Sequence, residues 1–136
     1  DLAMELGCSM AKLQNARLHV IHAAEFHEFD HMFPASISAK QKQAYRDEAE
    51  KHIEAQLNRA DLPMPAKAHF VIEPPDFAIM NCVEQHDIDL VVMGTVGRAG
   101  ISGFITGNTA ERLLSRIPCS LLAVKPPGFK SPVLLE

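Results

Sequence analysis

The 136-residue sequence predicts an α/β domain built on a doubly wound parallel sheet. Short apolar runs alternate along the chain with segments of helical periodicity, which is the pattern of right-handed β-α-β units. The run at 89–93 is almost continuously apolar, as expected for a strand that helices cover on both faces. With 47% hydrophobic residues, the chain can bury a core without disulfides or a metal ion.

The first predicted element is an amphipathic helix that ends near Asn15. Leu2, Leu6, Met10 and Leu13 recur in it at helical spacing, so we expect their face to lie in the core. The later elements follow from apolar runs and from helix start and stop signals. Strands are expected at 17–22, 68–72, 89–93 and 120–124, and further helices at 38–58, 75–86 and 108–116.

Proline and serine residues mark the boundaries of these elements. Ser38 opens the long polar helix, and Pro63 and Pro65 end that region. Pro75 suits the first turn of the next helix, because proline has no N–H to lose there. Residues 1–125 are therefore expected to form one domain, and the proline-rich residues 126–136 an extended tail that lies on the surface or on a partner.

Composition and charge exclude several classes of protein. The formal charge of -4 and a pI near 6.0 leave no basic field for a nucleic-acid backbone, so direct DNA or RNA binding is not expected. The three cysteines show no CxxC spacing and lie inside helical or strand-like patterns, which favours a reducing compartment. No apolar run is long enough to span a membrane, and we expect a soluble cytoplasmic protein.

A glycine-rich loop between a buried strand and a helix carries the clearest functional signal. Asn108 and Glu111 match an N-cap and its acidic partner, so a helix start after the loop is signalled independently. A strand-to-helix turn rich in glycine lets backbone N–H groups approach an anion such as a phosphate. Glycine can also simply permit a tight loop, and the cap can be an ordinary one. Five of the seven glycines are in this loop: Gly94, Gly97, Gly100, Gly103 and Gly107.

The loop and its flanks resemble the universal stress protein family. Gly94-Thr-Val-Gly97, nine further residues and Gly107-Asn108 are similar to the G-x2-G-x9-G-(S/T) signature of its ATP-binding members. Residues 89–95, 110–114 and 117–124 resemble the family's fourth strand, following helix and last strand. With Gly-Asn-Thr-Ala-Glu at 107–111 and a Lys-Pro...Gly-Phe...Ser-Pro tail, the chain looks most like the second domain of a tandem, E-type member. The resemblance implies an adenine nucleotide alpha-hydrolase-like fold and possible ATP binding. It implies contacts from Gly94, Thr95, Gly97, Gly107, Asn108 and Thr109, with Arg98 as an electrostatic helper.

Two departures from the family pattern bear on these expectations. The family's opening strand, which ends in an acidic residue near the adenine and ribose, would precede Asp1. That strand is central in the family's 3-2-1-4-5 sheet, so its neighbours need it, and we expect it either upstream of Asp1 or supplied by another chain. The second departure is Asn108, which stands where ATP-binding members carry Ser or Thr. An amide can also donate a hydrogen bond, but it can instead cap its own helix.

Other sequence patterns are assigned structural roles. His27-Glu-Phe-Asp-His31 spells the HExxH zinc motif, but it precedes Pro34 in an irregular segment, and no metal site is predicted. Phe26, Phe29, Met32 and Phe33 are expected to pack over the sheet edge or against a partner; the alternative is a lid over an apolar ligand. Cys82 and Cys119 are expected in the core without Lys, Arg or His near them, so no nucleophile is assigned.

These expectations combine into a stress-response domain rather than an enzyme. It binds a nucleotide weakly or has lost that ability, and it works through protein association. The resemblance implies pairing with itself or with a second domain of the family through residues 121–124. The alternatives are a weak ATPase, which would need a carboxylate in the loop, and a carrier of a small apolar ligand.

Overall fold

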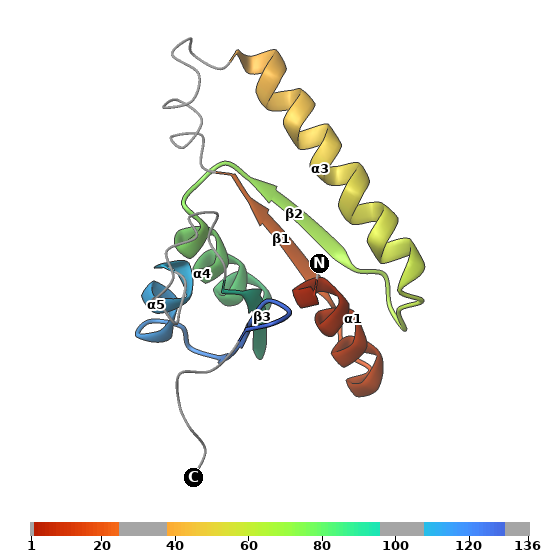
Figure 1. Ribbon diagram of the computed structural model, residues 1–136, viewed down its shortest axis with the longest axis vertical. Coiled ribbons are helices and arrows are strands. Elements are labelled where there is room, and N and C mark those ends of the chain that lie inside the picture. Colours follow the sequence, from red (N-terminus) through yellow and green to blue (C-terminus); the bar gives the residue numbers. More distant parts are fainter. Residues whose placement is uncertain (1, 25–37, 96–107, 130–136) are drawn as a thin grey trace.

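The computed structural model describes residues 2–24, 38–95 and 108–129. Every predicted helix and strand is present in them, with boundaries that agree to within two residues. The histidine, phenylalanine and methionine patterns of residues 26–33 lie outside the described part of the chain. The order is α1 (Leu2–Gln14), β1 (His19–Ala23), α3 (Ala39–Arg59), β2 (Lys67–Val71), α4 (Pro75–His86), β3 (Leu90–Gly94), α5 (Asn108–Leu114) and β4 (Ser120–Val124) (Figure 1).

Local sequence signals explain where the helices begin. The side-chain oxygen of Ser38 accepts a hydrogen bond from the backbone N–H of Gln41, whose side chain accepts one from the Ser38 N–H in return, so α3 starts with a complete capping box. Pro75 is the first residue of α4, as predicted. Asp87 ends α4 in the left-handed conformation, with a φ of 50°.

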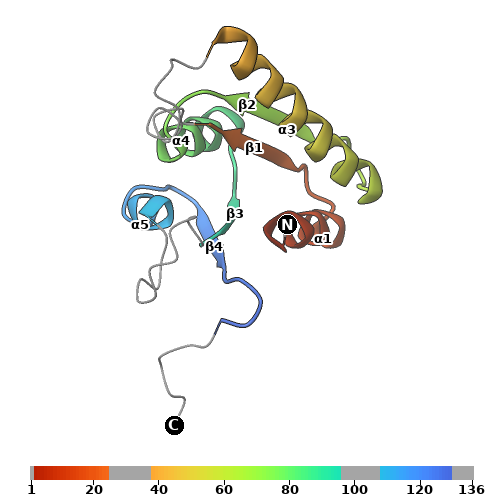
Figure 2. The ribbon, with the colours of Figure 1, turned by 45° about the horizontal axis from the view of Figure 1, so that its top comes forward.

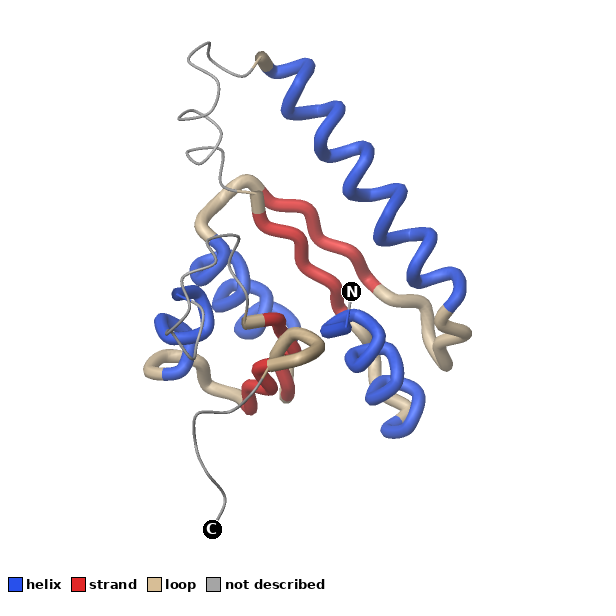
Figure 3. The backbone as a smooth tube through the Cα atoms, in the orientation of Figure 1, coloured by secondary structure: helices blue, strands red, loops and turns tan. Residues whose placement is uncertain are grey.

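The described strands form two parallel pairs instead of one continuous sheet. β1 pairs with β2, and β3 pairs with β4, each over five residues (Figure 3). This is the arrangement expected when the central strand of a 3-2-1-4-5 order is absent, because its two neighbours are left without a partner between them. The occupant of that position stays a prediction.

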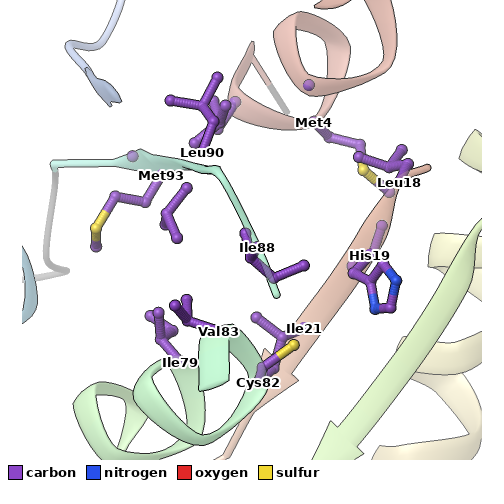
Figure 4. Close-up of a pocket in the computed structure, with 16 residues that line it drawn as sticks. Met4, Leu18, His19, Ile21, Ile79, Cys82, Val83, Ile88, Leu90 and Met93 are labelled. Atoms are coloured by element: carbon purple, nitrogen blue, oxygen red, sulfur yellow. The ribbon is translucent and has the colours of Figure 1, made fainter. Parts of the chain in front are cut away.

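A cavity of about 320 Å³ lies between the two strand pairs, and we call it the slot. Its walls come from four elements: α1 and α4 face each other across it, and β1 and β3 border its other sides (Figure 4). The lining is largely apolar, with residues such as Ile21, Val83 and Leu90. Such a space suits an extended segment whose backbone can pair with both free strand edges.

The helices form two groups around the strands, α4 with α5 and α1 with α3 (Figure 2). α4 packs on β1 and on α5, whereas α3 packs on β2, and α1 and α3 border a common groove. The predicted core face of α1 is partly wrong, because the buried residues are Gly7, Cys8 and Ala11 while Leu13 is 82% exposed. Small residues let the helix approach the strands closely, which the long side chain of Leu13 would prevent.

Candidate functional site

The described ends of the glycine-rich loop lie at the carboxyl end of β3 and the start of α5. Gly94 is the last residue of β3, and no atom of the described residues lies within 4 Å of the position that a Cβ atom would occupy there. Asn108 is the first residue of α5, and Thr109 is half-buried in its first turn. Gly97, Arg98 and Gly107 lie outside the described residues.

Thr95 holds the end of β3 against β4. Its backbone N–H and its hydroxyl both donate hydrogen bonds to the Val124 carbonyl, at 3.1 and 3.2 Å. Both hydrogen-bond donors of Thr95 are therefore committed inside the protein, and only the hydroxyl lone pairs and the backbone carbonyl oxygen are left for a ligand. If Thr95 contacts a nucleotide, as predicted, it does so as a hydrogen-bond acceptor.

α5 is fixed by apolar burial and by one ion pair to α4. Ala110 and Leu113 are fully buried, and Arg112 Nη1 lies 3.8 Å from Asp76 Oδ1. The Asp76 side chain is only 9% exposed, and its Oδ1 atom has no hydrogen-bond partner in the part of the chain that the structure describes. The position of the helix after the loop thus depends on a buried carboxylate in the first turn of α4.

A second cluster of chemically active side chains lies on the β1–β2 pair. His19 comes from β1, His69 from β2, and Cys82 and His86 from α4, and one ligand atom from each lies within 4.8 Å of the others. His19 Nδ1 and His69 Nε2 are 3.1 Å apart. The imidazole centroids are 5.3 Å apart for His19–His69, 4.6 Å for His19–His86 and 5.0 Å for His69–His86. We call these four residues the histidine cluster.

The local structure explains why these side chains converge. In the parallel register Ile21 pairs with His69, so His19 and His69 lie on the same face of the strand pair, two residues apart. α4 packs on β1, and Cys82 and His86 are one helical turn apart. In Figure 4, Cys82 and Ile21 lie side by side, with His19 farther along β1.

Burial changes the pKa values in the histidine cluster. It lowers the pKa of His19, with further lowering from His86, His69, Lys67 and Arg17. It also lowers the pKa of His69, again helped by His86 and Lys67. The His19 and His69 imidazoles are therefore neutral near pH 7, and their unprotonated ring nitrogens can bind a cation. Burial raises the pKa of the Cys82 thiol, which does not favour a reactive nucleophile.

This cluster was not predicted from the sequence, and the expectation that no histidine lies near Cys82 is wrong, because three histidines lie beside it. The signal that was present is the pair Cys82 and His86 at i,i+4 spacing, together with a histidine in each of two short strands. Only the register of β1 and β2 shows which histidines meet.

The opposite face of β1 carries a different polar contact. His22 Nε2 lies 3.3 Å from the Tyr45 hydroxyl of α3, and its ring packs near that of Phe70. Burial lowers the pKa of His22.

Among the described residues, no helix is long and apolar enough to cross a membrane.

Comparison with known proteins identifies the family. The universal stress protein family model matches residues 1–125. Universal stress protein E of Escherichia coli K12 is 42% identical over 62 residues, which are 46% of this chain but only 20% of that protein. The match thus spans about a fifth of the length of this relative.

Solved structures of the family share the fold. UspA from Lactobacillus plantarum matches with a TM-score of 0.71 and 17% identity, over 90% of this chain and 87% of the other. A universal stress protein in complex with cAMP matches with a TM-score of 0.66 and 19% identity, over 90% and 84%. Because the family model covers nearly the whole chain, and the fold agrees, the chain belongs to the universal stress protein family.

Proposed function

We propose that this domain of a stress-response protein binds an adenine nucleotide through the loop between β3 and α5. The observation that carries the proposal is the space at Gly94, where a ligand can approach the strand end without meeting a side chain of the described residues. The Gly94-x2-Gly97-x9-Gly107-Asn108 pattern supports it. So does the similar fold of a family member that was solved with cAMP.

The residues have distinct roles in this proposal. Backbone N–H groups at Gly94, Gly97 and Gly107 approach the phosphates, and Arg98 adds a positive charge. Asn108 and Thr109 contact the phosphate or ribose, and the Thr95 carbonyl oxygen can accept a hydrogen bond from a ribose hydroxyl. No chemical step is assigned, because nothing in the loop before Glu111 supplies a general base. The three free cysteines fit a reducing compartment, and we place the protein in the cytoplasm.

The test is nucleotide binding by the intact protein, purified without added nucleotide. Acid extraction identifies any nucleotide that is retained, and calorimetric titration then measures the affinity for ATP and for cAMP. Gly107→Val is expected to lower the affinity at least about tenfold, which corresponds to about 1.4 kcal/mol. Gly7→Ala is the matched control. Gly7 lies on α1, outside the glycine-rich loop, and the Cβ atom added there would lie 3.8 Å from Leu18 Cδ1, which is an ordinary contact. Absence of binding at millimolar nucleotide would refute the proposal.

We also propose that the domain pairs with a second family domain along β4. The Ser120 N–H donates to the Asp89 carbonyl of the neighbouring segment, so by alternation the Ala123 N–H points away from β3. Ala123 is exposed. Ala123→Pro removes only that outward N–H, which edge strands tolerate. We expect it to lower the mass measured by light scattering while circular dichroism stays unchanged; an unchanged mass would rule out pairing through this edge.

A further inference from the structure

The histidine cluster brings four donor atoms together from three elements that are far apart in sequence. His19 and His69 are 50 residues apart, yet their ring nitrogens lie 3.1 Å from each other. One N–H···N hydrogen bond would account for that distance alone. It does not account for the third ring and the thiol, whose ligand atoms lie within the same 4.8 Å.

We infer that His19, His69, Cys82 and His86 form a binding site for zinc. Three imidazole nitrogens and one thiolate are a donor set that Zn²⁺ takes in four-coordinate tetrahedral sites. Zn–N bonds of about 2.0–2.1 Å and Zn–S bonds of about 2.3 Å place the ligand atoms about 3.3–3.8 Å apart. The His19 and His69 nitrogens, 3.1 Å apart, need to separate by only about 0.2 Å to reach that spacing, and the other donors need shifts of about 1 Å.

Helix and strand geometry place the four metal-binding side chains where they face one another. Cys82 and His86 are one turn apart on α4, the spacing that places two metal ligands on one helix face. His19 and His69 share the strand face on which α4 packs. Regular elements thus hold all four donors, and such sites are more precise than sites on loops.

The charges around the cluster decide which ion it can hold. Lys67 and Arg17 lie close enough to affect the pKa of His19, and their positive charge opposes a cation. The Cys82 thiolate neutralises one of the two charges of the ion when its proton is released. A hard cation such as Mg²⁺ or Ca²⁺ finds no oxygen ligand in this donor set, whereas zinc gains from nitrogen and sulfur.

The site is structural, because four protein ligands leave no open position on the metal. Zinc would tie α4 to both β1 and β2, next to the slot that His19 and Cys82 help to line. His19 is the first residue of β1, whereas the glycine-rich loop follows the last residue of β3. The metal therefore acts apart from the proposed nucleotide site.

The test is metal content and cobalt spectroscopy of the intact protein, prepared without a histidine tag. Elemental analysis should find one zinc per chain. After removal of zinc, Co²⁺ should give the intense visible bands of a tetrahedral site and a near-ultraviolet charge-transfer band from the thiolate. Cys82→Ser should abolish the charge-transfer band. It and His86→Gln should each weaken zinc binding by at least about 100-fold, since losing even an outer-shell partner costs about 10–100-fold.

Two matched variants and a stability measurement separate a specific zinc site from adventitious metal binding. Cys119→Ser and His52→Gln change the same residue types outside the cluster and should leave both spectrum and affinity unchanged. Zinc at 100 times its dissociation constant should stabilise the native protein by about 2.7 kcal/mol, and Cys82→Ser, folded by circular dichroism, should lose that gain. A weak octahedral cobalt spectrum, stoichiometric copper in place of zinc, or equal loss in the control variants would overturn the proposal.

Discussion

The two strand pairs have the same backbone geometry but carry different chemistry. Each pair is parallel and five residues long. β3 and β4 are apolar apart from Ser120 and lead into the glycine-rich loop, whereas β1 and β2 carry His19, His22 and His69. The β3–β4 half offers backbone groups at its carboxyl end, and the β1–β2 half offers side chains on its faces. Backbone pairing therefore does not determine where a ligand can bind.

The largest expected effect is a loss of stability when a buried leucine of α5, in the β3–β4 half, is replaced. Leu113 is 1% exposed and fixes α5 in the β3–β4 half. Leu113→Ala should lower the free energy of unfolding by about 2–5 kcal/mol, because it removes buried apolar surface and leaves a cavity. Denaturant unfolding, with and without zinc, measures the change.

The adjacent leucine is the control for this comparison. Leu114 is 60% exposed, and Leu114→Ala should change stability by less than about 0.5 kcal/mol. Equal effects of the two substitutions would show that α5 does not pack as described.

The next effect concerns the ion pair that joins α4 to α5. Arg112→Gln should lower stability by about 1 kcal/mol, since it leaves the Asp76 carboxylate without its cation. Adding Asp76→Asn should restore part of that loss, because the charge that needed the cation is gone. Denaturant unfolding of both single variants and the double variant forms a double-mutant cycle. Strictly additive losses would mean that the two side chains do not interact.

The elements could be predicted from sequence, while the contacts between them could not. Helical spacing, Ser38 and Pro75 gave the right elements, because capping and periodicity are local properties. The gap in the sheet was expected from the resemblance. The face of α1 was partly wrong, since packing against the strands selects small residues such as Gly7. The histidine cluster depends on the two-residue offset between β1 and β2, which no local pattern encodes.

A smaller effect is a pH dependence that comes from the α3-facing side of β1. Burial lowers the pKa of His22 from 6.5, so the unfolded chain binds more protons than the folded one as the pH falls below 6.5. This contribution to stability is present above that pH and is lost as the solution becomes more acidic. His22 faces Tyr45 and Phe70, and Lys42 and Arg46 line the same hollow.

Melting temperatures measured with chelator above and below pH 6.5 check this prediction. The loss on acidification should be smaller in His22→Phe than in the native protein. His52→Phe is the control, because His52 is exposed on α3 and should leave the pH dependence unchanged. A larger loss in His22→Phe would show that the sign is wrong.

The smallest expected effect on stability is the sharpest test of the β3–β4 half. Gly94→Ala places a methyl group where no atom of residues 2–24, 38–95 and 108–129 lies within 4 Å, so the described part of the fold has room for it. Replacing a strand glycine should stabilise the protein by at most about 1 kcal/mol. The same methyl group would occupy the space through which a phosphate approaches the strand end, so nucleotide affinity should fall while the zinc affinity of the β1–β2 half stays constant. Calorimetry with ATP and with zinc on one preparation measures both, and unchanged ATP binding would mean that the ligand does not contact the backbone at Gly94.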